Sequence, residues 1–97
     1  MADIIRAAKL QSLSEIRLYE VDYALDLPDS VTVESATAIH IPPSGPASTP
    51  TVGTITGSIV PVTLGPLSVI GQHVLSISAT FSDGEISEVR IKIGVEF

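Results

Sequence analysis

The chain has 97 residues, of which 44% are hydrophobic and only 16% are charged, and its formal net charge is −6. This length suits one domain with a single core. The acidic excess repels phosphate backbones and anionic lipid surfaces, so neither nucleic acid nor a membrane is expected as a partner. Cysteine is absent, which excludes disulfides and thiolate metal sites.

Residues 1–16 follow neither a helical nor a strand period, and they include the basic residues Arg6 and Lys9. We interpret this segment as an N-terminal arm that is extended or partly helical; the alternative is a frayed terminus. The segment lacks a basic head followed by a long apolar run. This predicts that there is no signal peptide and that the protein is made in the cytoplasm.

Clear alternation begins at Tyr19 and predicts a half-buried strand. Its expected inward face holds Tyr19, Val21, Tyr23, Leu25 and Leu27. After a turn at Pro28 and Asp29, a second strand is expected over 31–41, with Val33, Ile39 and Ile41 on one face. A Pro-rich loop over 42–50 follows, then one or two short strands within 51–64 and another over 67–70.

The C-terminal third has the strongest strand signal. One strand has an apolar face of His73, Leu75, Ile77, Ala79 and Phe81. The Asp83-Gly84 pair predicts a hairpin turn because tight turns need a residue with positive φ. The return strand has an apolar face of Val89, Ile91, Ile93, Val95 and Phe97.

Several short strands separated by regularly spaced turns are typical of a sandwich. The sequence therefore predicts an all-β chain, with an immunoglobulin-like β-sandwich of about six to eight short antiparallel strands over 17–97 and the N-terminal arm over 1–16.

Charge is distributed unevenly along the chain. All five basic residues lie near the two ends, and no charged residue occurs from Ser35 to Ser82. Either hydroxyl groups keep this half soluble, or partner subunits cover it, since interface cores are depleted in charge. The basic arm can pair with the acidic residues Glu20, Asp22, Asp26 and Asp29 of a neighbour or of its own chain. The candidate interface residues are Ile4, Ile5, Arg6, Lys9, Leu10, Leu13, Glu20, Asp22, Arg90 and Lys92.

No pattern in the chain predicts catalysis. There is no cysteine nucleophile, and no Gly-x-Ser-x-Gly elbow is present. His40 and His73 are far apart in sequence with no acidic neighbour. We expect His73 to be a hydrogen-bonded structural residue and His40 to be exposed beside the Pro-rich loop. The chain is accordingly predicted to be no enzyme and to have no catalytic residues, cofactor or metal.

The runs 23–37 and 71–93 resemble small immunoglobulin-like domains of tailed-phage structural proteins. The resemblance rests on an acidic-hydrophobic first strand, the Leu27-Pro28 turn leading into Val31-Thr32-Val33, and the final hairpin. His73 stands where such sandwiches often have a tyrosine.

The resemblance implies a non-enzymatic virion protein, in the first place a capsid decoration or cementing subunit. Its partners would be the major capsid protein or other virion subunits, and it would form a homo-oligomer, a trimer or higher. The alternatives are a head–tail or tail accessory protein, or a module that binds a ligand or a carbohydrate. A carbohydrate site needs exposed aromatic rings, for which the sequence offers Tyr19 and Tyr23 at most.

Overall fold

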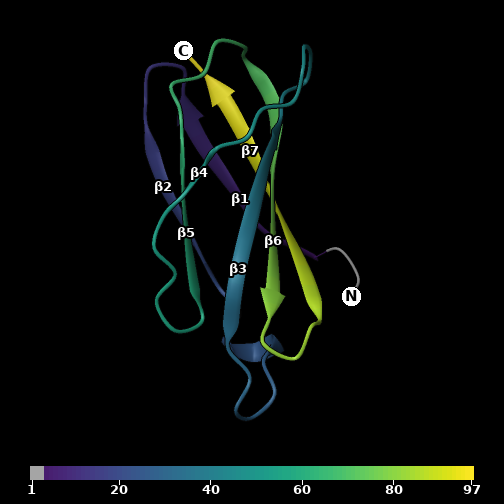
Figure 1. Cartoon of the computed structure of the whole chain (residues 1–97). Coiled ribbons are helices and arrows are strands. Elements are labelled where there is room, and N and C mark those ends of the chain that lie inside the picture. The colour runs from purple at the N-terminus through teal and green to yellow at the C-terminus, as the bar shows by residue number, and fades with distance from the viewer. Residues whose placement is uncertain (1–3) are drawn as a thin grey trace.

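The structure is a computed structural model that describes the backbone of residues 4–97 and the side chains of residues 10–97 (Figure 1). Its strands are β1 (Ile4–Ser12), β2 (Arg17–Asp22), β3 (Val33–Ile41), β4 (Thr51–Val52), β5 (Ile59–Leu64), β6 (Gly71–Phe81) and β7 (Ile86–Glu96). One short 3-10 helix, η1 (Ala24–Asp26), follows β2. No helix in this part of the chain has the length and apolar character needed to cross a membrane.

The strands form two sheets, in the order β1-β7-β6-β3 and β2-β5-β4, which lie face to face in Figure 1. This confirms the predicted all-β sandwich. The two groups correspond to the B-E-D and C-F-G strand groups of an immunoglobulin-like sandwich, since β6 and β7 form the final hairpin beside β3. The pairs β2–β5, β4–β5, β3–β6 and β6–β7 are antiparallel, as expected.

The segment predicted as a separate arm contributes the edge strand β1. It pairs in parallel with β7, from Ile4 beside Val89 to Ser12 beside Glu96. Residues 4–12 therefore belong to the sandwich, and one of its strand pairs is parallel, which the sequence analysis did not expect. The register shifts between Ile5 and Ala7, and this irregularity accounts for the missing period in the sequence.

The core lies between the sheets, and the C-terminal hairpin supplies much of it. The predicted inward face of β6 is confirmed, because His73, Leu75, Ile77, Ala79 and Phe81 are all buried. Val89, Ile91, Ile93 and Val95 of β7 are buried as well. Phe97 is 91% exposed because it follows the last paired residue of β7, so its predicted place in the core is wrong.

The first predicted strand is shorter than its alternation suggests. Tyr19, Val21 and Tyr23 are buried as expected, but Leu25 is 91% exposed. The chain turns into η1 after Asp22, whose carboxylate accepts a hydrogen bond from the Ala24 amide at 2.9 Å. That turn ends the alternation before Leu25.

A bulge reverses the faces of the second predicted strand. The register of β3 against β6 shifts between Val33 and Ser35. Beyond this shift Ala38 and His40 point into the core, whereas Ile39 and Ile41 are 48% and 42% exposed. An extra residue in one strand moves every following side chain to the other face, so the prediction that Val33 shares one face with Ile39 and Ile41 is wrong.

In the middle of the chain, the observed elements agree in part with those predicted from the sequence. Residues 42–50 form the expected loop, with one bridge between His40 and Ser48. Strands β4 and β5 lie within the predicted range 51–64. The strand expected over 67–70 is absent: these residues are irregular, and the Leu67 amide donates to the carbonyl oxygen of Leu13 at 2.8 Å.

Candidate functional site at the histidine pair

The two histidines of the chain meet at one end of the core. The bulge in β3 turns His40 inward, and the regular alternation of β6 turns His73 inward beside it. His40 Nε2 lies 2.7 Å from His73 Nδ1. The ring planes are within 4° of parallel, and the ring centroids are 4.9 Å apart. His40 is only 7% exposed, so its predicted position on the surface is wrong.

This pair is the middle of a longer hydrogen-bonded chain. His40 Nδ1 lies 3.1 Å from the Ser48 hydroxyl oxygen. At the other end, His73 Nε2 lies 2.6 Å from the carbonyl oxygen of Val69. The chain therefore links the Pro-rich loop, strands β3 and β6, and the loop that precedes β6.

The carbonyl at the end of this chain determines where the protons are. A carbonyl oxygen only accepts hydrogen bonds, so His73 Nε2 carries a proton. In a neutral His73 ring, Nδ1 is then the acceptor, and His40 Nε2 donates to it. A neutral His40 ring consequently has its lone pair at Nδ1, where it accepts from the Ser48 hydroxyl.

The environment keeps His40 neutral. Burial lowers the pKa of His40 because it penalises the charged ring, and the neighbouring His73 lowers it further. Two protonated rings would also place two N–H groups against each other across 2.7 Å. The pair can therefore hold at most one extra proton in this geometry.

The His73–Val69 contact has a structural role as well. In immunoglobulin-like sandwiches a tyrosine near the start of the corresponding strand donates to the backbone a few residues upstream. His73 makes the equivalent contact to Val69, four residues upstream. The expectation of a hydrogen-bonded structural histidine at this position is confirmed.

A hollow of about 490 Å³ opens beside His40 and Ser48. Its walls are the Pro-rich loop, the start of β4, the end of β5 and the loop over 65–69. The lining includes the hydroxyl residues Ser44, Ser48, Thr49, Thr51, Thr63 and Ser68, and it includes no Asp, Glu, Lys or Arg. The site is thus polar but uncharged.

The backbone holds Ser48 against His40. The His40 amide donates to the Ser48 carbonyl oxygen at 2.8 Å, and the Ser48 amide donates to the His40 carbonyl oxygen at 3.0 Å. Sequence reasoning missed Ser48 and the contact between the histidines. In the sequence, His40 alternates with the small residues Ala36 and Ala38, so the three side chains share one face of the strand. The bulge that turns this face toward the core is not visible in the sequence.

The predicted interface residues do not come together as one surface. Glu20 and Asp22 are exposed on β2, whereas Arg90 and Lys92 lie on β7 in the other sheet. Each of the two groups also has a partner within its own sheet or loop. Asp22 Oδ1 accepts a hydrogen bond from the Ser58 hydroxyl at 2.5 Å. Arg90 Nε lies 3.6 Å from Glu88 Oε1 on the same strand.

The predicted interface residues of β1 and its following turn differ in exposure. Leu10 is 66% exposed, and Leu13 is partly buried against the core. Ile4, Ile5, Arg6 and Lys9 belong to β1, but their side chains lie outside the described residues.

Within the described residues, no three His, Asp or Glu side chains gather in a way that can hold a metal ion. No protein-family model matches the chain, and no curated protein matches it.

The chain matches parts of solved structures of other proteins. InlP of Listeria monocytogenes has a TM-score of 0.56 and 13% identity over 95% of this chain. A 2,6-sialyltransferase of Photobacterium sp., solved with CMP and lactose, has a TM-score of 0.48 and 9% identity over 97% of this chain. The chain spans 26% of the InlP chain and 17% of the sialyltransferase chain. The likeness to InlP supports the sandwich fold alone.

Proposed function

We propose that this chain is a non-enzymatic structural subunit that functions by assembly, and more narrowly a bacteriophage capsid decoration or cementing protein. The observation that carries the proposal is the position of its exposed apolar side chains. Of the nine large apolar side chains exposed in the described residues, six lie toward the end of the sandwich where β1 and β7 finish. These six are Leu10, Ile16, Leu18, Ile41, Ile70 and Phe97. Ile39 is close to Ile41 on β3, in register with Ser76 in the middle of β6.

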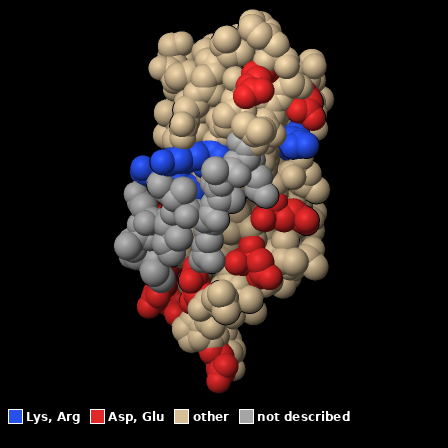
Figure 2. Space-filling model, turned by 180° about the vertical axis from the view of Figure 1, so that it is seen from behind, with Lys and Arg blue, Asp and Glu red and all other residues tan. Residues whose placement is uncertain are grey.

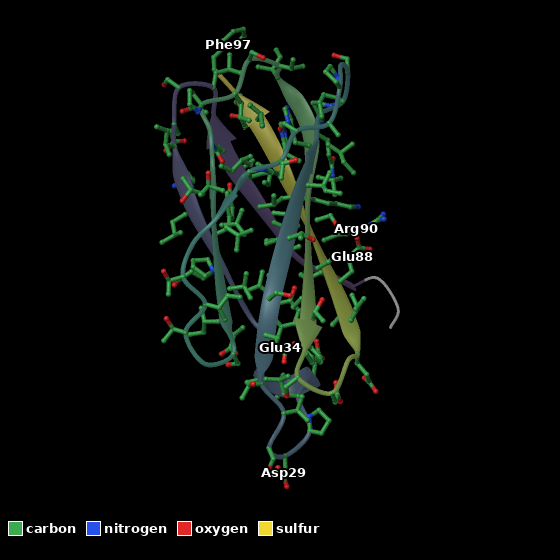
Figure 3. All side chains as sticks on the ribbon, viewed as in Figure 1. Asp29, Glu34, Glu88, Arg90 and Phe97 are labelled. Carbon is green, nitrogen blue, oxygen red and sulfur yellow. The ribbon has the colours of Figure 1, made fainter. Side chains whose placement is uncertain are left out.

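Charged residues border these apolar side chains. Glu15, Arg17 and Glu96 lie at the same end of the sandwich. Arg90 and Lys92 lie in register with Ser76 and Val74, which pair with Ile39 and Ile41. Figure 2 shows acidic side chains on the upper, middle and lower parts of one face, with uncharged residues at its uppermost tip. Figure 3 places Asp29 and Glu34 toward the opposite end from Phe97. Protein interfaces combine an apolar centre with a polar rim. Apolar side chains bordered by charged ones, as at this end, are suited to contact with other protein subunits.

The outer face of β3 is the part of this surface with the clearest geometry. Ile39 and Ile41 point away from the core, and Ile41 is in register with the partly buried Val74 of β6. β3 is also an edge strand of its sheet. Such edges are usually protected by charged residues, but Glu34 is the only charged residue of β3.

The virion assignment, with the major capsid protein or other virion subunits as partners, rests on the resemblance to phage immunoglobulin-like domains. A head–tail or tail position is compatible with the same surface. The carbohydrate-binding alternative loses its support, because Tyr19 and Tyr23 are 6% and 0% exposed and offer no ring to a sugar.

The test is the native mass of the full chain by light scattering, for the parent and for a variant with Ile39→Lys and Ile41→Lys. We expect the parent to be a trimer or a larger homo-oligomer and the variant to be monomeric, because two buried ammonium groups are costly at an interface. Ile86→Lys is the matched control, since Ile86 is 57% exposed at the opposite end of the sandwich. An equal mass for all three proteins contradicts assembly through this face.

Capsid binding tests the narrower assignment. The parent should cosediment with shells of the phage that encodes it, and the β3 double variant should bind them less. A parent that self-associates but never binds shells contradicts the decoration role while leaving self-assembly standing.

A further inference from the structure

The hydrogen-bonded chain Ser48–His40–His73 has the order of a nucleophile, a base and a group that orients the base. This constellation is recognised by geometry and can occur on unrelated folds. The geometry points to a reactive serine: Ser48 is a nucleophile activated by His40, with His73 as a positioning residue, and it accepts acyl groups from small neutral esters. This reactivity is separate from the proposed assembly, which uses the outer face of β3.

Ser48 and His40 are held ready for proton transfer. The Ser48 hydroxyl oxygen lies 3.1 Å from His40 Nδ1, within the reach that a general base needs. Two backbone hydrogen bonds, of 2.8 and 3.0 Å, join the same two residues, so their backbones keep a fixed relative position and both side chains start from adjacent points. Ser48 is exposed and His40 is buried, which leaves the nucleophile open to a reagent and the base protected.

His73 provides what the base requires. Its Nε2–H is committed to the Val69 carbonyl oxygen at 2.6 Å, so its Nδ1 accepts from His40 Nε2. This leaves the lone pair of His40 at Nδ1, directed at the serine hydroxyl. After His40 takes the serine proton, the resulting imidazolium still donates from Nε2 to His73, so the charged ring keeps its partner without rearrangement.

The hollow indicates the class of substrate. It has a volume of about 490 Å³, and its lining carries hydroxyl groups, prolines and Leu67 but no ionised side chain. An anionic or cationic substrate would find no counter-charge there. A small neutral ester fits both the volume and the absence of charge.

The Ser48 oxygen attacks the ester carbonyl carbon and forms a new O–C bond, while its proton moves to His40 Nδ1. The bond from the carbonyl carbon to the leaving oxygen breaks, and the leaving group departs with that electron pair and takes up the proton from His40 or from water.

The experiment treats the full chain with p-nitrophenyl acetate at mildly alkaline pH, where His40 is neutral. Released nitrophenol is measured together with the site of acetylation by peptide mass spectrometry. We expect acetylation at Ser48 and a loss of the protein-dependent rate of about 100-fold in Ser48→Ala, the scale of general-base assistance. Ser14→Ala is the matched control, because Ser14 is an exposed serine that does not line the hollow, and it should react like the parent.

A conservative replacement tests the positioning role of His73. Asparagine can place an amide oxygen where His73 Nδ1 accepts from His40, whereas leucine cannot. His73→Asn should therefore retain much more of the rate than His73→Leu, with both folds verified by thermal unfolding. The rate of the parent should rise with pH as His40 loses its proton. Equal reaction of Ser48→Ala and the parent, or acetylation only at other hydroxyl groups, overturns the proposal.

Discussion

Tyr23 links the two sheets with one side chain. Its ring is fully buried and meets Phe81 edge to face, with centroids 5.9 Å apart and planes at 75°. Its hydroxyl donates to the carbonyl oxygen of Ile77 at 2.8 Å. Buried tyrosines usually find such a partner, because an unsatisfied hydroxyl in the core is costly. The sequence predicts the inward position of this ring but not the partner of its hydroxyl.

Ile77 tests the predicted core most directly. It is fully buried in the central part of β6, between Ala38 of β3 and Val89 of β7. Ile77→Ala should lower the free energy of unfolding by about 2–5 kcal/mol, because it leaves a cavity in a packed layer. Chemical denaturation measures this change. The exposed Ile86 is the control, since Ile86→Ala should change stability by no more than about 0.5 kcal/mol; similar small effects for both would contradict the packing.

His40 makes stability depend on pH. Burial and the neighbouring His73 lower its pKa in the folded state, whereas the unfolded chain binds a proton near the ordinary value of about 6.5. The unfolded state therefore binds more protons as pH falls, so stability is full above about pH 6.5 and is lost below it.

Denaturation at a series of pH values between neutral and mildly acidic checks this dependence. His40→Gln removes the titrating ring, so the stability of this variant should fall less steeply with acid than that of the parent. The same carboxylates are present in both proteins, so their contribution to the pH dependence of stability cancels when the two profiles are compared. Parallel pH profiles for the two proteins would mean that His40 keeps its ordinary pKa on folding.

At the scale of elements, the loops that close the upper end depend on one close backbone approach. Gly65 has a φ of +121°, and a Cβ atom there would lie 2.2 Å from the carbonyl oxygen of Glu15 and 3.0 Å from Gln11 Nε2. The turn after β1 and the loop after β5 can pack this closely only because residue 65 lacks a side chain.

Gly65→Ala should consequently destabilise the protein by about 3 kcal/mol or more, since it adds a clash with backbone to the cost of a positive φ. Gly45→Ala is the matched control: its φ is +90°, and nothing lies within 4 Å of the added atom. The control should lose only about 1–2 kcal/mol. Thermal and denaturant unfolding of both variants measures the difference, and equal losses would show that the contact at Gly65 relaxes freely.

The strands show which elements a pattern can predict. β6 and β7 run for 11 residues each with strict alternation, and the sequence predicts both with their faces. β1 and β3 contain register shifts, and there the sequence predicts a separate arm in one case and a single shared face in the other, which the bulge divides. A bulge adds one residue to a strand without an obvious sequence signature. Beyond the bulge, alternation counted from the start of the strand assigns side chains to the wrong face.

At the scale of the whole molecule, the uncharged middle of the chain includes most of β3 and all of β4, β5 and β6, so it runs the length of the sandwich. The segment from Ser35 to Ser82 supplies the end of β3, the Pro-rich loop and the loop before β6, which surround the histidine pair and the hollow. The acidic residues are left mainly on η1, the turns and the outer faces. The assembly test on β3 belongs to this scale, because it asks whether this unequal surface is covered by other subunits.

By itself, the sequence determined the fold class, the C-terminal hairpin, the buried position of His73 and the segregation of charge. Those features depend on local alternation and composition, which are properties of the sequence itself. Only the tertiary structure decided that residues 4–12 join the sheet, that His40 turns inward and that Ser48, His40, His73 and Val69 form one hydrogen-bonded chain. These depend on strand pairing and on contacts between residues far apart in sequence, and neither has a local signature.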